Sequence, residues 1–213
     1  TANKVKYILT GANYSTECVK NPLEWHYHAS DLTQLLDIHR QFGSRPLKHF
    51  PTSNILTHKI YFPLMKGLRV VKPLNFMPYL KDEAKALLQR EYGWQPYPQK
   101  HFESRFTKFY ESYWLPKKFG YDTRKVQYSS LIVTKQMTRQ EALARLAKPA
   151  YDELGIHHDV EYVATKLGIS GEELDGYLTA PNRSYHDYKS QKDAYRIGAG
   201  VMRLLGSERG GKR

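Results

Sequence analysis

The sequence predicts an α/β fold in two parts, a short-stranded segment followed by a mostly helical one. Residues 1–75 contain two short apolar runs that end at a small residue or at proline, which is typical of strands. Residues 76–205 have apolar residues at helical spacing between glycines and prolines. We therefore expect residues 1–75 to be the later part of a parallel-sheet domain, residues 76–205 a helical domain, and residues 206–213 a disordered basic tail.

The first strand is expected at Val5–Thr10 (VKYILT), where Gly11 ends the run and a helix follows from Tyr14. A strand, a turn of small residues and a helix together present helix N-terminal amides to anions in α/β nucleotide-binding proteins. The remaining elements expected in residues 1–75 are a helix at Leu32–Phe42 that stops at Gly43, a helix at Ile55–Leu64 that ends around Pro63, and a strand at Leu68–Val71 closed by Pro73.

An apolar stripe predicts the central helix of the second part. Phe102, Phe106, Phe109 and Tyr113 recur every three to four residues, and Pro116 is expected to stop this helix. The other expected elements are helices at Asp82–Tyr92, Tyr121–Lys135 (with Val126, Leu131 and Val133 buried), Val160–Leu167 and Asp187–Leu205, and capping boxes at Thr138/Glu141 and Ser170/Glu173.

Length and composition exclude two classes of protein. A chain of 213 residues can bury a sizeable core, and its single cysteine, Cys18, excludes a disulfide scaffold. No stretch approaches the roughly 18 apolar residues of a membrane span, so we do not expect membrane insertion. With a single cysteine, the chain is expected in the reducing cytoplasm. The start at Thr1, without an initiator Met, predicts that the chain was cut from a longer polypeptide.

The net charge is +12, and the basic excess lies early in the chain. Residues 1–75 have 10 basic and 4 acidic residues and residues 100–125 have 7 and 3, whereas residues 76–99 balance at 3 and 3. Such a field attracts phosphate-bearing ligands, either polynucleotides or nucleotides and nucleotide sugars. The alternative is a basic surface with no role in binding.

Two motifs carry the candidate chemistry. In GANYSTE, Gly11 lets the backbone approach a ligand, Asn13 can hydrogen-bond to it, and Glu17 can reach a Mg²⁺ on a triphosphate; the alternative for Asn13 is a helix N-cap. In the block from Lys100 to residue 125, basic residues surround an aromatic stripe and are suited to hold pyrophosphate. From this block we expect Lys100 and His101 to contact substrate and Arg124 to contact the nucleotide; the alternative is a solvated amphipathic helix.

The sequence resembles a known family over most of its length. The run YGWQPYPQKHFESRFTKFYESYWLPKKFGYDTRKVQYSSLI, followed by MTRQEAL, is similar to the N-acetyl sugar amidotransferases of bacterial O-antigen and lipopolysaccharide synthesis. GANYSTE, SDLTQLLDIHRQFG, RVVKPLNFMPY and PAYD extend the resemblance to about Tyr188. That family belongs to the adenine nucleotide α-hydrolase (PP-loop) superfamily, so residues 1–75 are identified as the C-terminal part of a PP-loop domain.

The resemblance implies an ATP-dependent, AMP-forming enzyme that converts the N-acetyl group of a nucleotide-linked sugar into an acetamidino group. Its ammonia would come from a separate glutaminase resembling that of imidazole glycerol phosphate synthase. By analogy with NAD synthetase, Asn13 and Glu17 would lie at the nucleotide, with Glu17 a Mg²⁺ ligand. The analogy with asparagine synthetases points to four catalytic residues: Glu103, Arg105, Lys117 and Lys118.

The chain departs from the family in two respects, since it lacks the SGGxDS phosphate loop and the N-terminal cysteine-rich segment of many members, and it leaves two other classes open. It contains no SGGxDS phosphate loop, so its active site alone is expected to be incomplete. A nucleic-acid-binding protein, such as a tRNA-modifying relative, would explain the basic charge and 17 tyrosines, but many aromatic residues fall at helix-core spacing and no RNA-binding module is present. A non-catalytic fragment that docks the glutaminase is the third class. The His26/His28 and His157/His158 patterns lack further ligands at zinc spacing.

Overall fold

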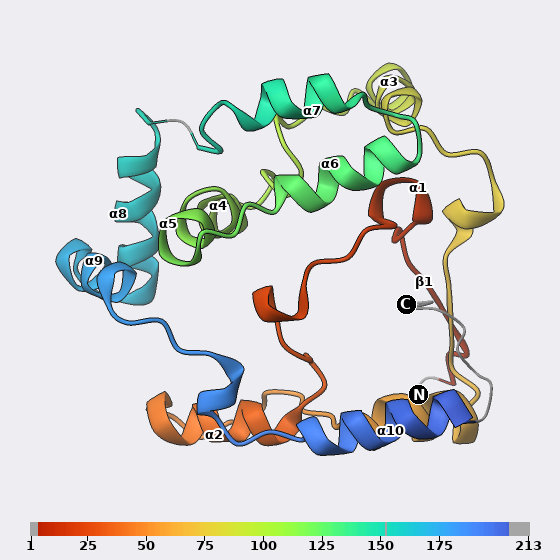
Figure 1. The fold of residues 1–213 in the computed structure, drawn as a ribbon, viewed down its shortest axis with the longest axis vertical. Helices are drawn as coiled ribbons and strands as arrows, with labels where there is room; N and C mark the ends of the chain where they lie inside the picture. Colours follow the sequence, from red (N-terminus) through yellow and green to blue (C-terminus); the bar gives the residue numbers. More distant parts are fainter. Residues whose placement is uncertain (1–3, 152, 205–213) are drawn as a thin grey trace. The chain divides into compact units, whose positions relative to one another are not determined.

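The computed structural model describes residues 4–151 and 153–204, and most of them are helical (Figure 1). The predicted tail, residues 206–213, lies outside the described residues. Within the described part of the chain, no helix is both long and apolar enough to cross a membrane. The α-helices longer than one turn are α2 (Leu32–Phe42), α3 (Lys81–Tyr92), α4 (Arg105–Phe109), α5 (Leu115–Phe119), α6 (Arg124–Val133), α7 (Arg139–Leu146), α8 (Ile156–Leu167), α9 (Gly171–Thr179) and α10 (Lys192–Leu204).

Both predicted strands are confirmed, and they pair in parallel. The strands β1 (Tyr7–Leu9) and β2 (Arg69–Val71) form a two-stranded sheet. Backbone bonds at its two ends, from Arg69 N to the Lys6 carbonyl (2.7 Å) and from Thr10 N to the Val71 carbonyl (3.0 Å), fix the parallel register. The α/β class is therefore correct, although β1 is exposed along its length and the sheet of the described residues has only two strands.

The chain packs into two units, each discontinuous in sequence. Unit 1 comprises residues 1–6, 27–69 and 183–213, and unit 2 comprises residues 7–26 and 70–182. These units do not coincide with the predicted segments 1–75 and 76–205. They also divide the charge: unit 1 holds 16 basic and 5 acidic residues, and unit 2 holds 17 and 16. Almost the whole basic excess therefore belongs to unit 1.

Two buried aspartates of α2 hold unit 1 together. Asp31 caps α2 by accepting from Gln34 N, and its other oxygen accepts from the backbone N of Gln191 (2.6 Å). Asp37 accepts from the backbone N of Lys189 (3.0 Å) in the same way. Since a buried carboxylate needs such donors, the segment before α10 is fixed against α2. The last helix consequently begins at Lys192, after a 3₁₀ turn at Tyr185–Asp187, and not at Asp187 as predicted.

Prolines do not end the two helices that they were expected to end. Pro63 lies inside the π-helix η2 (Thr57–Met65), and Pro116 lies in α5, directly after the π-helix η4 (Tyr110–Trp114). Proline lacks an N–H and its ring crowds the carbonyl four residues earlier, which the wider π turn relieves. The helical run that starts at α4 therefore continues to Gly120, where a left-handed backbone (φ 73°) ends it.

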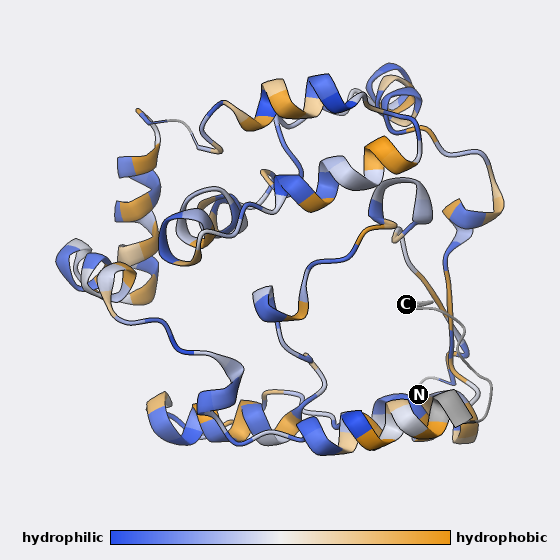
Figure 2. Cartoon of the chain, in the orientation of Figure 1, coloured by the Kyte–Doolittle hydropathy of each residue, from blue (hydrophilic) through white to orange (hydrophobic). Residues whose placement is uncertain are grey.

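The later residues of the predicted apolar stripe join the core and the earlier ones do not. Phe109 is fully buried and Tyr113 packs against the core, but Phe106 is half exposed and Phe102 precedes the helix. The core of unit 2 lies where α4 meets α8 and α8 meets α9 (Figure 1). Its buried members are Phe109, Ile156, Val163, Ala164 and Leu174. Figure 2 shows hydrophobic and hydrophilic residues alternating along α8, as an amphipathic helix requires.

Local signals for the later helices are largely confirmed. Thr138 and Glu141 form the full capping box of α7, and Ser170 caps α9 by accepting from Glu173 N. The Glu173 carboxylate accepts a hydrogen bond from the Tyr177 hydroxyl. In α6, Leu131 is buried as expected, whereas Val133 at the helix end is two-thirds exposed.

A nearly buried carboxylate, Asp159, ties α8 to α4. Arg105 Nε lies 2.8 Å from one of its oxygens, and Lys108 Nζ lies 2.7 Å from the other. Burial alone would raise the pKa of Asp159, but the hydrogen bonds from Lys108 and Arg105 outweigh this effect and hold the pKa below its ordinary value. The Arg105 guanidinium also stacks over the Tyr162 ring at 4.3 Å.

We expect Asp159→Asn to lower the unfolding free energy at neutral pH by about 2 kcal/mol, because it leaves two cations without their carboxylate. Since the folded-state pKa lies below the unfolded one, this contribution is present above the ordinary aspartate pKa and is lost as the pH falls through the lowered value. Urea unfolding at neutral and at acid pH measures both effects. Glu161→Gln, an exposed change on the same helix, is the control, and equal stability of the two variants at neutral pH would contradict the assignment.

Candidate functional site

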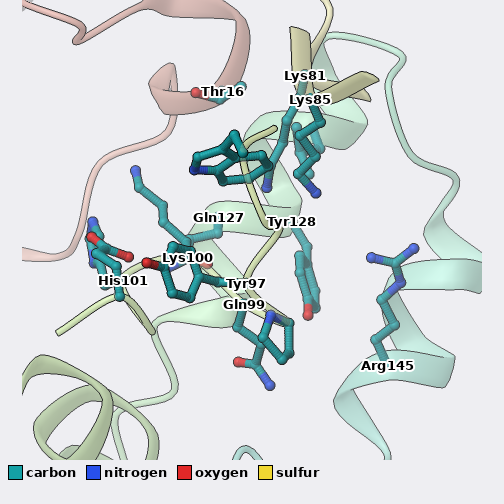
Figure 3. A pocket seen from close by; sticks show the side chains of 14 residues that line it. Thr16, Lys81, Lys85, Tyr97, Gln99, Lys100, His101, Gln127, Tyr128 and Arg145 are labelled. Carbon is teal, nitrogen blue, oxygen red and sulfur yellow. The ribbon is translucent and has the colours of Figure 1, made fainter. Parts of the chain in front are cut away.

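A cavity of about 330 Å³ lies within unit 2, between α3, the loop at residues 94–103, α6 and α7. Its lining combines basic side chains with aromatic rings, and Figure 3 shows them converging from separate elements. The lining residues are Thr16, Lys81, Lys85, Trp94, Tyr97, Pro98, Gln99, Lys100, His101, Glu103, Gln127, Tyr128, Leu131 and Arg145.

Helix α3 supplies two of the cations. Lys81 and Lys85 are four residues apart and therefore lie on one face, from which both extend into the cavity (Figure 3). The Gln136 side chain accepts from the backbone N of Lys81 (2.8 Å) and so fixes the start of the helix. Lys85 lies 3.8 Å from the Asp82 carboxylate, which points into solvent.

The loop after α3 supplies a cation and two rings. Gly93 ends α3 with a left-handed backbone (φ 63°), and Trp94 and Tyr97 then meet edge to face at 6.2 Å. Lys100 Nζ lies 2.6 Å from a Glu17 oxygen of α1 (Tyr14–Glu17). The next residue, His101, has a left-handed backbone (φ 69°), and its Nδ1 lies 2.8 Å from Glu111 Oε1.

The fourth cation, Arg145, reaches the cavity from α7 (Figure 3). The end of α7 is held by the buried guanidinium of Arg124, whose Nη1 donates to the carbonyls of Arg145, Lys148 and Pro149 at 3.0–3.5 Å. Hydrogen bonds to Asp122 hold Arg124 itself and raise its pKa. Arg124 thus fixes the backbone that carries the Arg145 side chain.

Repulsion between these cations is evident at Lys81. Burial lowers the pKa of Lys81, and the positive charges of Lys85, Lys100 and Arg145 lower it further. Glu103 is the single carboxylate in the lining. An anion with several charges would relieve the repulsion, and the neighbouring rings could stack on a planar group.

The sequence predicts a Mg²⁺ at Glu17, and the structure describes the surroundings of that carboxylate. Among the described residues, no three His, Cys, Asp or Glu side chains are grouped so that they could hold a metal ion. Mg²⁺ is commonly held by one or two carboxylates together with substrate phosphates, and here the Glu17 carboxylate is paired with the Lys100 ammonium. The Mg²⁺ role of Glu17 therefore stays a prediction.

Residues of the GANYSTE motif both cap a helix and line the cavities of unit 2. Asn13 is buried and caps α1: its Oδ1 accepts from Thr16 N (2.9 Å), and its Nδ2 donates to the Gly11 carbonyl. Asn13 is therefore the helix N-cap that the sequence offered as the alternative to a ligand contact. Thr16 lines the main cavity, and Glu17 lines a smaller adjoining cavity of about 150 Å³ that also contains Lys100 and His101.

The predicted residues of the KHFESRFT…LPKKFG block divide into two groups. Lys100, His101 and Glu103 line the cavity. Arg105, Lys117, Lys118 and Arg124 do not line it. Lys118 Nζ instead donates to the Leu178 and Ala180 carbonyls at the end of α9, and Lys117 is exposed. The catalytic roles of Arg105, Lys117 and Lys118 stay predictions.

Sequence reasoning missed Lys81, Lys85, Trp94 and Arg145. Residues 76–99 balance in charge, so the segment gave no basic signal, yet Asp82 and Glu83 are exposed while the two lysines face the cavity. The spacing of Lys81 and Lys85 on a helix that opens with two acids was the available signal. Nothing in the sequence placed Arg145 beside them.

Residues 103–202 match the model of a family described as "LPS biosynthesis protein WbpG-like, C-terminal domain". No curated protein and no solved structure matches the chain. The match associates this segment with lipopolysaccharide biosynthesis and supports that part of the resemblance. The PP-loop assignment of residues 1–75 stays a prediction.

We expect Lys81→Met to raise the unfolding free energy at neutral pH by about 0.5 kcal/mol, because it removes a like-charge pair at i, i+4 spacing. The folded-state pKa of Lys81 lies below the unfolded one, so the unfolded chain binds more protons between these values. The advantage of the variant should therefore shrink as the pH rises through this window. Denaturant titrations at several pH values measure it, with the exposed Lys125→Met on α6 as control; a destabilised Lys81→Met chain would refute the repulsion.

Proposed function

We propose that this chain is part of an ATP-dependent N-acetyl sugar amidotransferase of lipopolysaccharide biosynthesis, acting on a nucleotide-linked sugar. The observation that carries the proposal is the cavity with four cations and three aromatic rings, because both substrates of such an enzyme are phosphate esters. The family match supports the proposal independently, since the matched residues 103–202 include part of the cavity lining: Glu103, Gln127, Tyr128 and Arg145.

The reaction needs activation of a very poor electrophile. The acetamido oxygen would attack the α-phosphorus of ATP, forming an O-adenylyl imidate as pyrophosphate leaves. Ammonia would then add to the imidate carbon, AMP would leave with the former amide oxygen, and loss of a proton from nitrogen would give the amidine. No side chain has to act as a nucleophile, so the positioning of two anionic substrates and the stabilisation of phosphate charge are the main tasks of the protein.

The cavity residues divide these tasks. Lys81, Lys85 and Arg145 neutralise phosphate charge, and helices α3 and α7 hold them in place before the substrate arrives. His101 and Glu103, which also line the cavity, would contact the sugar. We further propose a separate glutaminase as the source of ammonia, and an SGGxDS loop outside this chain as the site of the ATP phosphates.

A nucleic-acid-binding function is the second candidate, and one observation favours it. Unit 1 holds 16 basic and 5 acidic residues, a density suited to a phosphate backbone. Such binding would weaken steeply with salt and would not depend on the cavity of unit 2.

The test uses the complete gene product with ATP, Mg²⁺, ammonium and a panel of nucleotide-linked N-acetyl sugars. We expect sugar-dependent release of AMP and pyrophosphate, and a sugar product with the mass change of oxygen replaced by NH. Lys85→Gln should lower kcat/KM by about tenfold or more, since one charge-assisted contact to phosphate is lost.

Lys125→Gln removes the same charge from an exposed position and should leave turnover unchanged. ATP left intact with every sugar would refute the enzyme. Salt-sensitive binding of single-stranded RNA in that case would support the second candidate.

A further inference from the structure

We infer that the cavity of unit 2 is a site for the diphosphate group of a nucleoside diphosphate, and that binding there takes up a proton. The inference deepens the proposed function by naming the ligand group at this cavity, but the chain can meet or fail this test without turning over any sugar. It stands on the number of cations, on the elements that carry them and on the rings beside them.

The arrangement of the cations favours a diphosphate over a single phosphate. They come from three different parts of the chain: Lys81 and Lys85 from α3, Lys100 from the loop, and Arg145 from α7. One phosphate group can contact one or two of them, whereas two linked phosphates present acceptors in several directions. Glu103 is the one carboxylate of the lining and Glu17 beside it is paired with Lys100, so the remaining positive charge is balanced by an anion of about two charges.

The rings favour a nucleoside next to the diphosphate. Trp94, Tyr97 and Tyr128 line the same cavity as the cations, and Trp94 and Tyr128 are only partly exposed. A planar base can stack on such rings, while the buried Leu131 contributes an apolar part of the wall. A cavity of about 330 Å³ is at the lower end of the size of sites that take small organic ligands. It would therefore hold the nucleoside diphosphate part of a nucleotide sugar and not the whole molecule.

Proton uptake follows from the surroundings of Lys81. Three cations and Asp82 act on it: Lys85 and Asp82 from α3, Lys100 from the loop, and Arg145 from α7. From the remaining elements of the lining, the cavity presents Thr16, Gln99, His101, Glu103 and Tyr128. Burial and the cations lower the pKa of Lys81, and a bound diphosphate would reverse the effect of the cations.

The sign of the pH dependence is fixed by this linkage. The bound state holds the Lys81 proton more tightly than the free state, so affinity is highest below the free-state pKa of Lys81. It falls as the pH rises through that value, and over the same range each ligand bound takes up a fraction of a proton from the buffer.

The experiment is isothermal titration of the 213-residue chain with inorganic phosphate, inorganic pyrophosphate, uridine, uridine diphosphate and adenosine diphosphate. Each titration is run at several alkaline pH values in two buffers with different ionisation heats, which gives the number of protons taken up. We expect pyrophosphate to bind at least about tenfold more tightly than phosphate, and the nucleoside diphosphates to bind more tightly than pyrophosphate. The two nucleotides distinguish a sugar-nucleotide carrier from the adenine nucleotide that is consumed.

Variants separate the cavity from the rest of the basic surface. Lys81→Met should weaken pyrophosphate binding about tenfold and abolish the proton uptake, and Trp94→Ala should weaken the nucleoside diphosphates while sparing pyrophosphate. Lys125→Gln is the matched control and should change neither. Circular dichroism and thermal melting confirm that each variant is folded.

Three results would overturn the inference: equal affinity for phosphate and pyrophosphate, binding unaffected by Lys81→Met, or uptake of protons that persists in that variant. Failure of the enzyme is a different result. A chain that binds diphosphates with proton uptake, yet comes from a gene product that never releases AMP, would retain this site and lose the proposed reaction.

Discussion

The buried guanidinium of Arg124 is the contact on which the functional part of the molecule depends. It begins α6 and reaches the carbonyls at the end of α7, so it fixes two helices that bring Gln127, Tyr128 and Arg145 to one cavity. A buried guanidinium is stable only when its donors are satisfied, and here Asp122 and three carbonyls satisfy them. The nucleotide contact predicted for Arg124 stays a prediction, and in the structure its guanidinium holds the backbone that carries Arg145.

The same rule separates the structural cations of unit 2 from those of the cavity. Arg105 and Lys108 are held by Asp159, and Lys118 is held by the end of α9, which fixes helices to one another. Lys81, in contrast, is surrounded by further cations, and its pKa is lowered first by burial and then by those charges. A group of like charges held together by a rigid scaffold lowers stability in the free protein and raises affinity for an anion, which is the usual compromise at a binding site.

What could be predicted from the sequence was local. The cap of α7 at Thr138 and the end of α3 at Gly93 depend on residues within one turn, and both were correct. Pro116 was misread because a π turn just before it removes the steric conflict on which the rule depends. The cavity could not be predicted, since it joins Lys81 to Arg145 across 64 positions, and no periodicity reports a contact at that separation.

Net charge was a poor guide to the site for a related reason. Nearly all of the net charge of +12 belongs to unit 1, which includes most of the basic early residues. The cavity lies in unit 2, which has 17 basic and 16 acidic residues. The carboxylates of the described part of unit 2 either form fixed ion pairs, as Asp159 does, or are exposed to solvent, as Asp82 is. A neutral unit can therefore present a strongly positive cavity, because the field at a site depends on where the opposite charges are held and not on their number.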